Sequence, residues 1–291
     1  MISRDASATP ADDDSLDALR AEARRWARKP RRRGFWYATE DMLRANRTYG
    51  SALLIAAFAQ PILYLLGLVL GLATLIPQRI EDAGASVSYV TFVAPALLVT
   101  AALAVAAEEF ASPVLAGFTQ RQSFSVLATS PLSPGQIANG LILAAIIRMT
   151  VVTVAFYAIV WAIGAVPAPA TGWIGIPAAV VGALTLGFPL MGFASSLTED
   201  DGRFALVQRV VFIPLVFFSG TFYPLSALPG WLTWVGWLSP VWHASELARV
   251  ASYGEGEDRL ATLVHIVFIA LFAVIGYVLA RRAFLRRLDD A

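Results

Sequence analysis

The residues of this chain that could do chemistry are few, and most are charges set beside or within apolar stretches. Arg148 lies inside one long apolar stretch, and Glu108 and Glu109 end another. If these stretches cross a membrane, an arginine near mid-bilayer costs ~2.5–3.5 kcal/mol and needs a partner or a water-filled pathway. We predict an intramembrane ion pair between Arg148 and Glu108 or Glu109. For the two glutamates, a solvated helix end or a contact with another protein is the alternative.

Catalytic groups are scarce. His243 and His265 are the only histidines and there is no cysteine, so the sequence predicts neither a metal cluster nor a thiolate site. Lys29, the only lysine, lies in no glycine-rich loop, whereas a phosphate-binding loop needs Gly-Lys-Ser/Thr. We therefore predict that the chain is no enzyme and holds no cofactor or metal. A lipid-modifying enzyme would need a nucleophile or metal cluster that the sequence does not offer.

The composition indicates what positions these residues. Of 291 residues, 57% are hydrophobic and 15% are charged, whereas a soluble domain has about 25% charged residues. The apolar residues form long unbroken stretches, unlike the short alternating segments of a membrane β-barrel. We predict an all-α polytopic membrane protein.

Six stretches have the ~20 apolar residues that a helix needs to cross a bilayer. They are residues 51–76, 89–107, 137–166, 173–197, 204–222 and 261–280. The predicted membrane domain covers residues 51–285, followed by a short tail, 286–291.

Arginine placement predicts the orientation. A basic run from Arg20 to Arg33 precedes the first span, and Arg281, Arg282, Arg286 and Arg287 follow the last. Basic flanks stay in the cytoplasm, so both termini are expected there, which requires an even number of crossings. The same argument makes nucleic-acid binding a poor interpretation of the basic run.

The N-terminal region divides into two parts. Residues 1–33 are expected to form a disordered, basic cytoplasmic tail in which any helix ends at Pro30. Residues 34–50 place Trp36, Met42 and Leu43 among charged residues at helical spacing. That pattern predicts an amphipathic helix on the membrane surface, with a plain linker as the alternative.

The cytoplasmic loop, residues 110–136, has a similar pattern. Phe118, Phe124 and Leu127 alternate with polar residues such as Arg121, which predicts a short amphipathic helix. Ser133 or Pro134 is expected to start the following helix. A helix of this kind suits docking into a groove on another protein.

The stretch after the fifth span cannot cross the membrane because glycines and prolines interrupt it. We expect a re-entrant segment on the outer face, residues 223–245, between spans five and six. Its tryptophans suit anchoring at the membrane interface, with stacking on a sugar as the alternative. Glu246 and Arg249, three residues apart, are close enough to pair on a helix. The candidates of this segment are Phe222, Tyr223, Pro224, Pro229, Trp231, Trp234, Trp237, Pro240 and His243.

Two stretches together resemble a known family. FSVLATSPLSPGQIANG in the cytoplasmic loop and FFSGTFYPLSALPGWLTWVGWLSPVWHASELAR on the outer side are similar to permease subunits of ABC type-2 exporters. The nodulation-type lipo-oligosaccharide and drug-resistance export permeases are the nearest in pattern, over residues 35 to 285. One departure is Leu141, where an acidic residue often follows the glycine that closes the loop motif.

The resemblance implies a permease that pairs with a second permease, itself or a sibling, and with two copies of an ATPase subunit. The partner subunits would bind ATP and Mg and drive export of a lipid-linked glycan, glycolipid or hydrophobic drug. By this analogy Trp36, Met42, Leu43, Phe118, Arg121, Phe124 and Leu127 contact the ATPase. Membrane lipids are the remaining partners, and we expect the bacterial cytoplasmic (inner) membrane, since an Ala-, Val- and Arg-rich chain suggests a GC-rich bacterial genome.

An ion-coupled secondary transporter without an ATPase is the alternative function. Such transporters often use carboxylates inside the membrane. The predicted spans carry none away from their cytoplasmic ends. The sequence therefore favours the ATP-driven exporter.

Overall fold

The computed structural model describes residues 10–45, 62–63, 66–67, 71, 79–82, 85–199, 202–254 and 258–290. The expected first span, residues 51–76, falls almost wholly outside these ranges. So do residues 1–9 of the expected tail and residues 46–50 of the expected interfacial helix.

Four helical runs among the described residues are long and apolar enough to cross a membrane. They are Tyr89–Phe118, Pro134–Ala162, Pro169–Ser196 and Arg259–Asp289. The first comprises α4 and α5, the second is α7, the third comprises α8 and α9, and the last is α14. The protein is therefore a helical, multi-pass membrane protein. The individual helices are α4 (Tyr89–Phe110), α5 (Ser112–Phe118), α8 (Pro169–Gly172) and α9 (Gly175–Ser196).

The expected fifth span, residues 204–222, is a shorter helical run with a change of pitch. It consists of α10 (Arg203–Val207), the π-helical turn η3 (Gln208–Phe212) and α11 (Ile213–Phe218). The apolar part, Arg209–Phe218, is shorter than the four long runs. A π-helical turn widens the helix locally and is common at functional positions.

The core of the bundle forms around α4 and α9. Nearly every side of α4 is buried, and α9 packs against α4, α14 and α13 (Pro240–Tyr253). Small residues permit close approach: a Cβ on Gly182 of α9 would lie 2.3 Å from the Cβ of Ala244 on α13. In contrast, α14 has few buried residues and leaves most of its apolar surface exposed. That surface suits contact with lipid.

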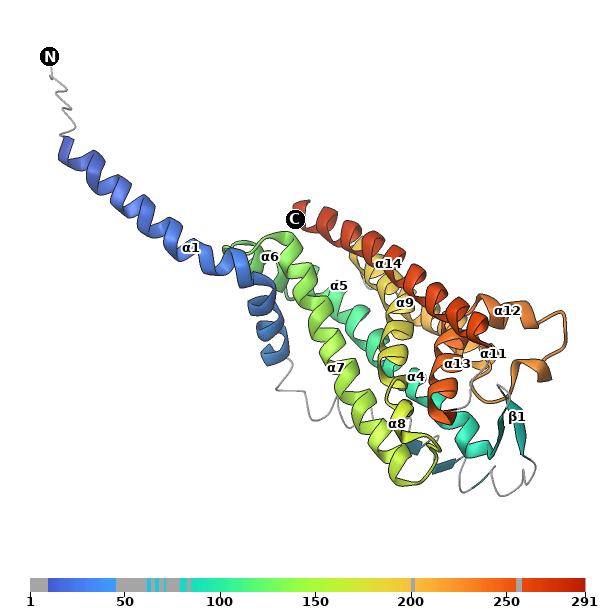
Figure 1. Ribbon diagram of the computed structural model, residues 1–291. Helices are drawn as coiled ribbons and strands as arrows, with labels where there is room; N and C mark the ends of the chain where they lie inside the picture. Colours follow the sequence, from blue (N-terminus) through green and yellow to red (C-terminus); the bar gives the residue numbers. More distant parts are fainter. Residues whose placement is uncertain are drawn as a thin grey trace, which may run out of the picture.

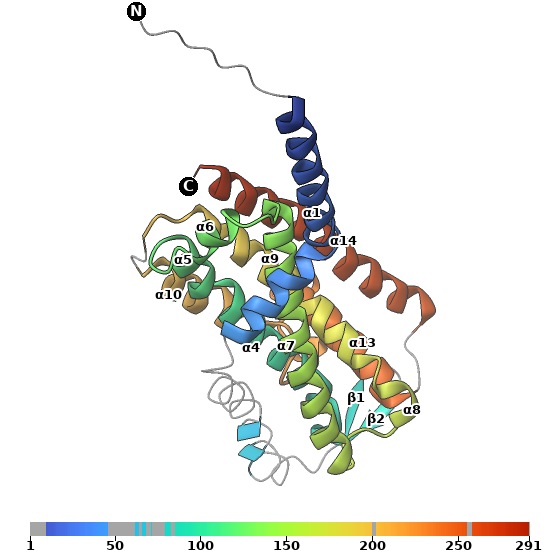
Figure 2. The same cartoon turned by 90° about the vertical axis from the view of Figure 1, so that its left-hand side faces the viewer.

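The bundle has two distinct ends (Figure 1). One end, called the loop end, carries α5, α6 (Ser123–Ala128) and the C-terminus of α14. The opposite end, called the hairpin end, carries α8 and a small hairpin in which β1 (Ile80–Asp82) pairs antiparallel with β2 (Ala85–Val87). A view from the side shows the same separation (Figure 2).

The segment after α11 folds into short pieces and not into another span. It contains the 3-10 turn η4 (Leu225–Ala227), the short helix α12 (Thr233–Leu238) and then α13. Pro224 and Ser239 are extended, which separates these pieces. The glycines and prolines in the sequence account for the breaks.

The N-terminal region differs from the expectation. A single helix, α1 (Pro10–Ala45), includes Pro30, so the expectations of disorder over residues 10–33 and of a helix end at Pro30 are wrong. The helix-favouring Ala, Leu, Arg and Glu residues on both sides outweigh the unfavourable proline. Figure 1 shows that α1 changes direction before it meets the bundle at the loop end.

Candidate functional site

The loop expected on the cytoplasmic side, residues 110–136, forms two helices where one was expected. α5 ends at Phe118, Gln122 adopts the left-handed conformation (φ 47°), and α6 (Ser123–Ala128) follows. The single amphipathic helix expected around residues 118–127 is therefore wrong. The break between α5 and α6 lets the aromatic residues on its two sides face each other. α7 (Pro134–Ala162) then begins at Ser133, which forms a reciprocal capping box with Gln136.

Three buried phenylalanine rings fasten this loop to the last helix of the bundle. The ring centroids of Phe118 and Phe124 lie 4.9 Å apart. The Phe284 ring of α14 lies 4.9 Å from Phe118 and 5.0 Å from Phe124. Tilted aromatic pairs contribute ~0.5–1.5 kcal/mol beyond their buried area. Gly117 makes room for this cluster, because a Cβ there would lie 2.3 Å from the Phe124 ring.

Burial changes the role of Phe118 and Phe124, which were expected to contact the ATPase. Phe118 and Phe124 face inward, so they hold the loop in place and do not present a surface to a partner. Arg121 is exposed, Leu127 is half-buried against the core, and Val126 is 65% exposed. The outward face of the loop thus carries Arg121 and Val126. Val126 was not among the residues expected from the sequence to contact the ATPase.

A second surface at the loop end is formed by the last turns of α1. Trp36 is 50% exposed, while Met42 and Leu43 are half-buried. Glu40 and Arg44 form an exposed ion pair one turn apart, with an N–O distance of 2.5 Å. A hollow of about 290 Å³ opens here, lined by Trp36, Thr39, Glu40, Leu43 and Arg44. It offers both apolar and charged contacts.

α1 is held to the bundle where it crosses α7. The Thr39 hydroxyl lies 3.2 Å from the Gly140 carbonyl, to which it donates, and 2.7 Å from that of Phe35. A Cβ on Gly140 would lie 2.5 Å from the Cβ of Ala38 and 3.0 Å from the amide nitrogen of Thr39. The crossing therefore requires glycine at this position.

Gly140→Val is expected to separate α1 from α7. The new side chain meets backbone that cannot turn aside, and overpacking of this kind costs ~1–3 kcal/mol. Limited proteolysis with trypsin should cleave the Arg-rich α1 faster in this variant. Gly230→Val is the matched control, because no atom lies within 4 Å of a Cβ there. Equal protection of α1 in both variants would contradict the crossing.

Within the bundle, Arg148 of α7 forms an ion pair with Glu109 of α4. Their side chains are only 17% and 10% exposed. Glu108 is exposed and within electrostatic range of Arg148. Of the two glutamates, Glu109 therefore supplies the direct partner, which places one compensated pair between two membrane helices.

The outer-segment candidates divide into exposed and buried groups. Trp231, Trp234 and Trp237 are exposed, and Trp234 and Trp237 lie three residues apart on α12, so these two share one face of that helix. The other members pack more closely: Phe222, Tyr223 and Pro224 are half-buried, Pro229 is exposed, and Pro240 and His243 are buried. The exposed tryptophans suit an interfacial membrane position.

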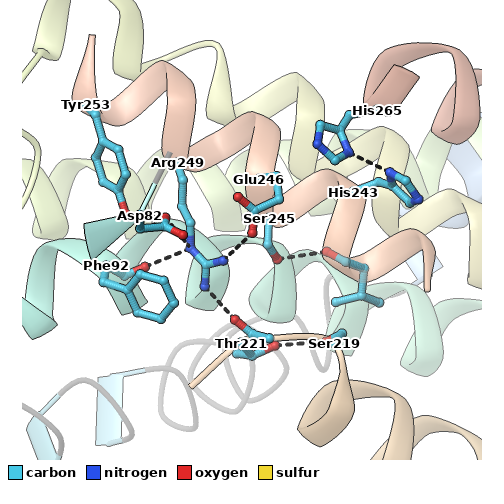
Figure 3. Close-up of polar contacts among 12 residues, drawn as sticks. Asp82, Phe92, Ser219, Thr221, His243, Ser245, Glu246, Arg249, Tyr253 and His265 are labelled. Carbon is cyan, nitrogen blue, oxygen red and sulfur yellow. Dashed lines mark hydrogen bonds and ion pairs between the residues drawn. The ribbon is translucent and has the colours of Figure 1, made fainter. Parts of the chain in front are cut away.

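A fully buried arginine organises the region where α13 meets the hairpin end (Figure 3). Arg249 donates to the Glu246 carboxylate at 2.6 Å and to the Gly220 carbonyl at 2.6 Å. It also donates to the Phe92 carbonyl at 3.1 Å, and its guanidinium carbon lies 3.8 Å from the centre of the Phe92 ring. Asp82 of β1 completes the charge balance at 4.0 Å.

Tyr253 extends this network to the end of α13. Its hydroxyl donates to the Asp82 carboxylate at 3.2 Å. Burial raises the pKa of Tyr253, so the hydroxyl keeps its proton and remains a donor. Arg249 and Tyr253 thus tie α13, α4, the Gly220 turn and β1 together.

Two histidines join α13 to α14. The Nδ1 atoms of His243 and His265 lie 2.6 Å apart, and Nε2 of His243 lies 2.9 Å from the Trp237 carbonyl oxygen. Trp242 and Phe268 pack against the His243 ring. No group of three or more His, Asp or Glu side chains in the described part of the chain could hold a metal. The contacts of the two rings with each other and with Trp242 hold α13 against α14.

Comparison with known proteins identifies the family. The profile of the ABC-2 type transporter family matches residues 35–253, which is most of the chain. The chain belongs to the ABC-2 type transporter family. The matched region of this ABC-2 protein includes the loop of residues 110–136, the Arg148–Glu109 pair and the Arg249 network. It is a membrane transport component, and such components are generally not catalytic themselves.

Curated relatives of this ABC-2 protein point the same way. It is 24% identical over 253 residues to "Nodulation protein J" of Rhizobium leguminosarum bv. viciae, covering 81% of this chain and 88% of that protein. It is 25% identical over 247 residues to "Nodulation protein J" of Bradyrhizobium diazoefficiens, covering 84% of this chain and 90% of that protein. No solved structure matches the chain.

Proposed function

We propose that this ABC-2 permease is the membrane half of an ATP-driven exporter whose ATPase subunits dock at the loop end. The observation that carries the proposal is the surface formed there by Trp36 of α1 and by Arg121 and Val126 of the loop. These side chains are exposed. Trp36 lies on α1 and Val126 on α6, which both pack against the membrane-crossing helix α7, and Arg121 lies in the turn before α6. Movement of a docked partner would therefore reach the membrane helices directly.

The proposed topology has six spans with both termini in the cytoplasm. The loop end is the cytoplasmic end, since the arginines that end α14 lie there and basic residues favour the cytoplasm. Residues 51–76 supply the first crossing, and α10 to α11 supply the fifth. Residues 223–245 form the re-entrant segment on the outer face, and the part of α1 from residue 34 onward lies at the membrane surface.

The proposed assembly contains two permeases and two ATPase subunits, which bind the ATP and Mg. The cargo is an amphipathic molecule such as a lipid-linked glycan, a glycolipid or a hydrophobic drug. Family resemblance supports this class of cargo. We place the complex in the bacterial cytoplasmic membrane; the similar proteins named above come from rhizobia and Bradyrhizobium.

Copurification and transport test the proposal. A tagged permease purified from its native host should bring down an ATPase with a Walker-type phosphate-binding loop. Inside-out vesicles containing both should accumulate a fluorescent glucosyl-lipid in a vanadate-sensitive way. An ATPase-free preparation whose uptake instead collapses with the proton or sodium gradient would favour the ion-coupled transporter.

Arg121→Glu combined with Val126→Asp should weaken ATPase docking. Both side chains are exposed, so the change alters the surface without opening the core. We expect copurified ATPase to fall about tenfold or more, since each tenfold corresponds to ~1.4 kcal/mol of binding. Arg259→Glu, a charge reversal at the exposed start of α14, is the control and should leave copurification unchanged. Unchanged docking in the double variant would reject this surface.

A further inference from the structure

We propose that α14 transmits movement of the coupling loop (residues 110–136) to the outer helix α13, acting as a lever across the membrane. This inference rests on the proposed function, because it names the element through which ATPase movement reaches the outer face. α14 contacts α6 and α7 toward its C-terminus and α13 toward its N-terminus. Among the described residues, α14 joins the Phe118–Phe124–Phe284 cluster at the loop end to the contact between His243 and His265.

The inner arm of the lever is Phe284. Its ring is fully buried and lies against both Phe118 and Phe124, one from each helix of the coupling loop. Any displacement of α5 or α6 therefore pushes directly on α14. Close-packed side chains pass on such a displacement, because protein interiors have low compressibility.

A tight crossing with α9 supplies the pivot. A Cβ on Gly276 would lie 3.1 Å from the Cβ of Phe188, and one on Gly192 would lie 3.4 Å from the Cα of Ala280. Tyr277 also lies at this level, where its hydroxyl donates to the Asn139 side chain at 2.9 Å. At 1.5 Å per residue, Phe284 lies about 12 Å from Gly276 along the helix.

The outer arm ends at His265, about 17 Å from Gly276 in the other direction by the same helical rise. Nε2 of His243 faces a carbonyl oxygen that only accepts, so it carries the hydrogen. With His243 neutral, its Nδ1 accepts, and Nδ1 of His265 donates across the 2.6 Å contact. The bond is directional, so α13 follows α14 at this point.

Between these contacts the surface of α14 that faces away from the bundle is open. Its exposed apolar side chains include Val267, Leu271, Val274 and Leu279. α14 packs along α9, with close approaches at Gly276 and Gly192, and its opposite surface is open to lipid, so it can rock against α9 about these close approaches. The outer helix α13 then carries the motion to the Gly220 turn through Arg249.

A labelling experiment tests the lever. The chain has no native cysteine, so Trp234→Cys gives a single reporter on the exposed face of α12. The permease–ATPase complex is placed in proteoliposomes, and the labelling rate with a membrane-impermeant maleimide is measured with and without ATP and vanadate. We expect the rate to change about fivefold or more, a usual size for coupling between sites.

Phe284→Ala should abolish this ATP-dependent change while ATPase copurification and ATP hydrolysis persist, and Phe284→Met should restore part of it. Leu279→Ala, on the lipid-facing side of the same helix, should change nothing. At the outer end, His265→Leu should also abolish the change, whereas His265→Asn, which keeps a donor near the Nδ1 position, should retain much of it. If the Phe284→Ala protein aggregates, the comparison of His265→Leu with His265→Asn tests the lever.

The outcomes separate the two proposals. A complex that contains ATPase but shows no reporter response, or a response that survives both Phe284→Ala and His265→Leu, overturns the lever alone. A preparation without any ATPase overturns the proposed function and the lever with it. Loss of the response in Phe284→Ala and His265→Leu, with Leu279→Ala unaffected, supports the lever.

Discussion

Arg249→Leu is expected to lower the free energy of unfolding by about 3–5 kcal/mol, because removing one partner of a buried ion pair leaves the other charge uncompensated. In thermal unfolding of the detergent-solubilised protein, this corresponds to a fall of roughly 6 °C or more in the midpoint. The loss includes the bonds to the Phe92 and Gly220 carbonyls.

The large effect follows from the buried polar groups that lose their partner when Arg249 is replaced. Glu246 is buried and would lose its guanidinium partner, and Asp82 would lose its nearby cation. Two backbone carbonyls would lose their donor, and an unpaired buried polar group costs ~1–3 kcal/mol. A leucine side chain fills part of the volume but restores none of these bonds.

Two control variants isolate the cause. Arg44→Ala removes an arginine from an exposed pair with Glu40, and such pairs stabilise a protein by only ~0.2–1 kcal/mol. Arg249→Lys keeps the charge but loses the planar fork, so it should fall between the wild type and Arg249→Leu. An Arg249→Leu midpoint equal to that of Arg44→Ala would show that the network does not hold α13.

The Arg148–Glu109 pair should show strong coupling in a double-mutant cycle. Arg148→Leu leaves Glu109 largely buried without its partner, and Glu109→Leu does the same to Arg148. Each single change should cost about 3–5 kcal/mol. The double leucine variant should recover most of that loss, because well-packed apolar residues often replace a buried pair at little cost.

Unfolding midpoints of the two single variants and the double variant measure this coupling. Replacing Glu108 by leucine is the neighbouring control, and a small effect is expected because Glu108 is exposed. Additive losses in the double variant would mean that the two charges act independently, contrary to the pairing. Recovery of stability without recovery of transport would point to a further role in the transport cycle.

Local sequence signals predicted much of the fold. Long apolar stretches predicted the four long runs, although the first run continues to Phe118 and the last to Asp289, well beyond the predicted ends at residues 107 and 280. Ser133 before Pro134 predicted the start of α7. Prolines and glycines marked the breaks around α12. These features depend on neighbours in the chain, so one sequence suffices to find them.

The contacts that organise the candidate sites could not be predicted in this way. Phe284 meets Phe118 and Phe124 from the far end of the chain, and Tyr253 reaches Asp82 across 171 positions. Hydropathy places each helix but does not fix which side chains meet across the bundle. The loop aromatics were accordingly expected at a partner surface, although their apolar rings are more stable when buried against α14.

Site-specific photo-crosslinking tests the central claim of ATPase docking at the loop end most directly. A photoreactive phenylalanine analogue is placed at Val126 on the exposed face of the loop, or at Val151, whose exposed side chain lies within the span of α7. We predict that the analogue at position 126, irradiated in native membranes, forms an adduct with a subunit carrying a Walker-type phosphate-binding loop, and that the analogue at position 151 forms none. Adducts of equal yield at both positions, or none at Val126 in membranes that carry out ATP-driven export, would contradict it.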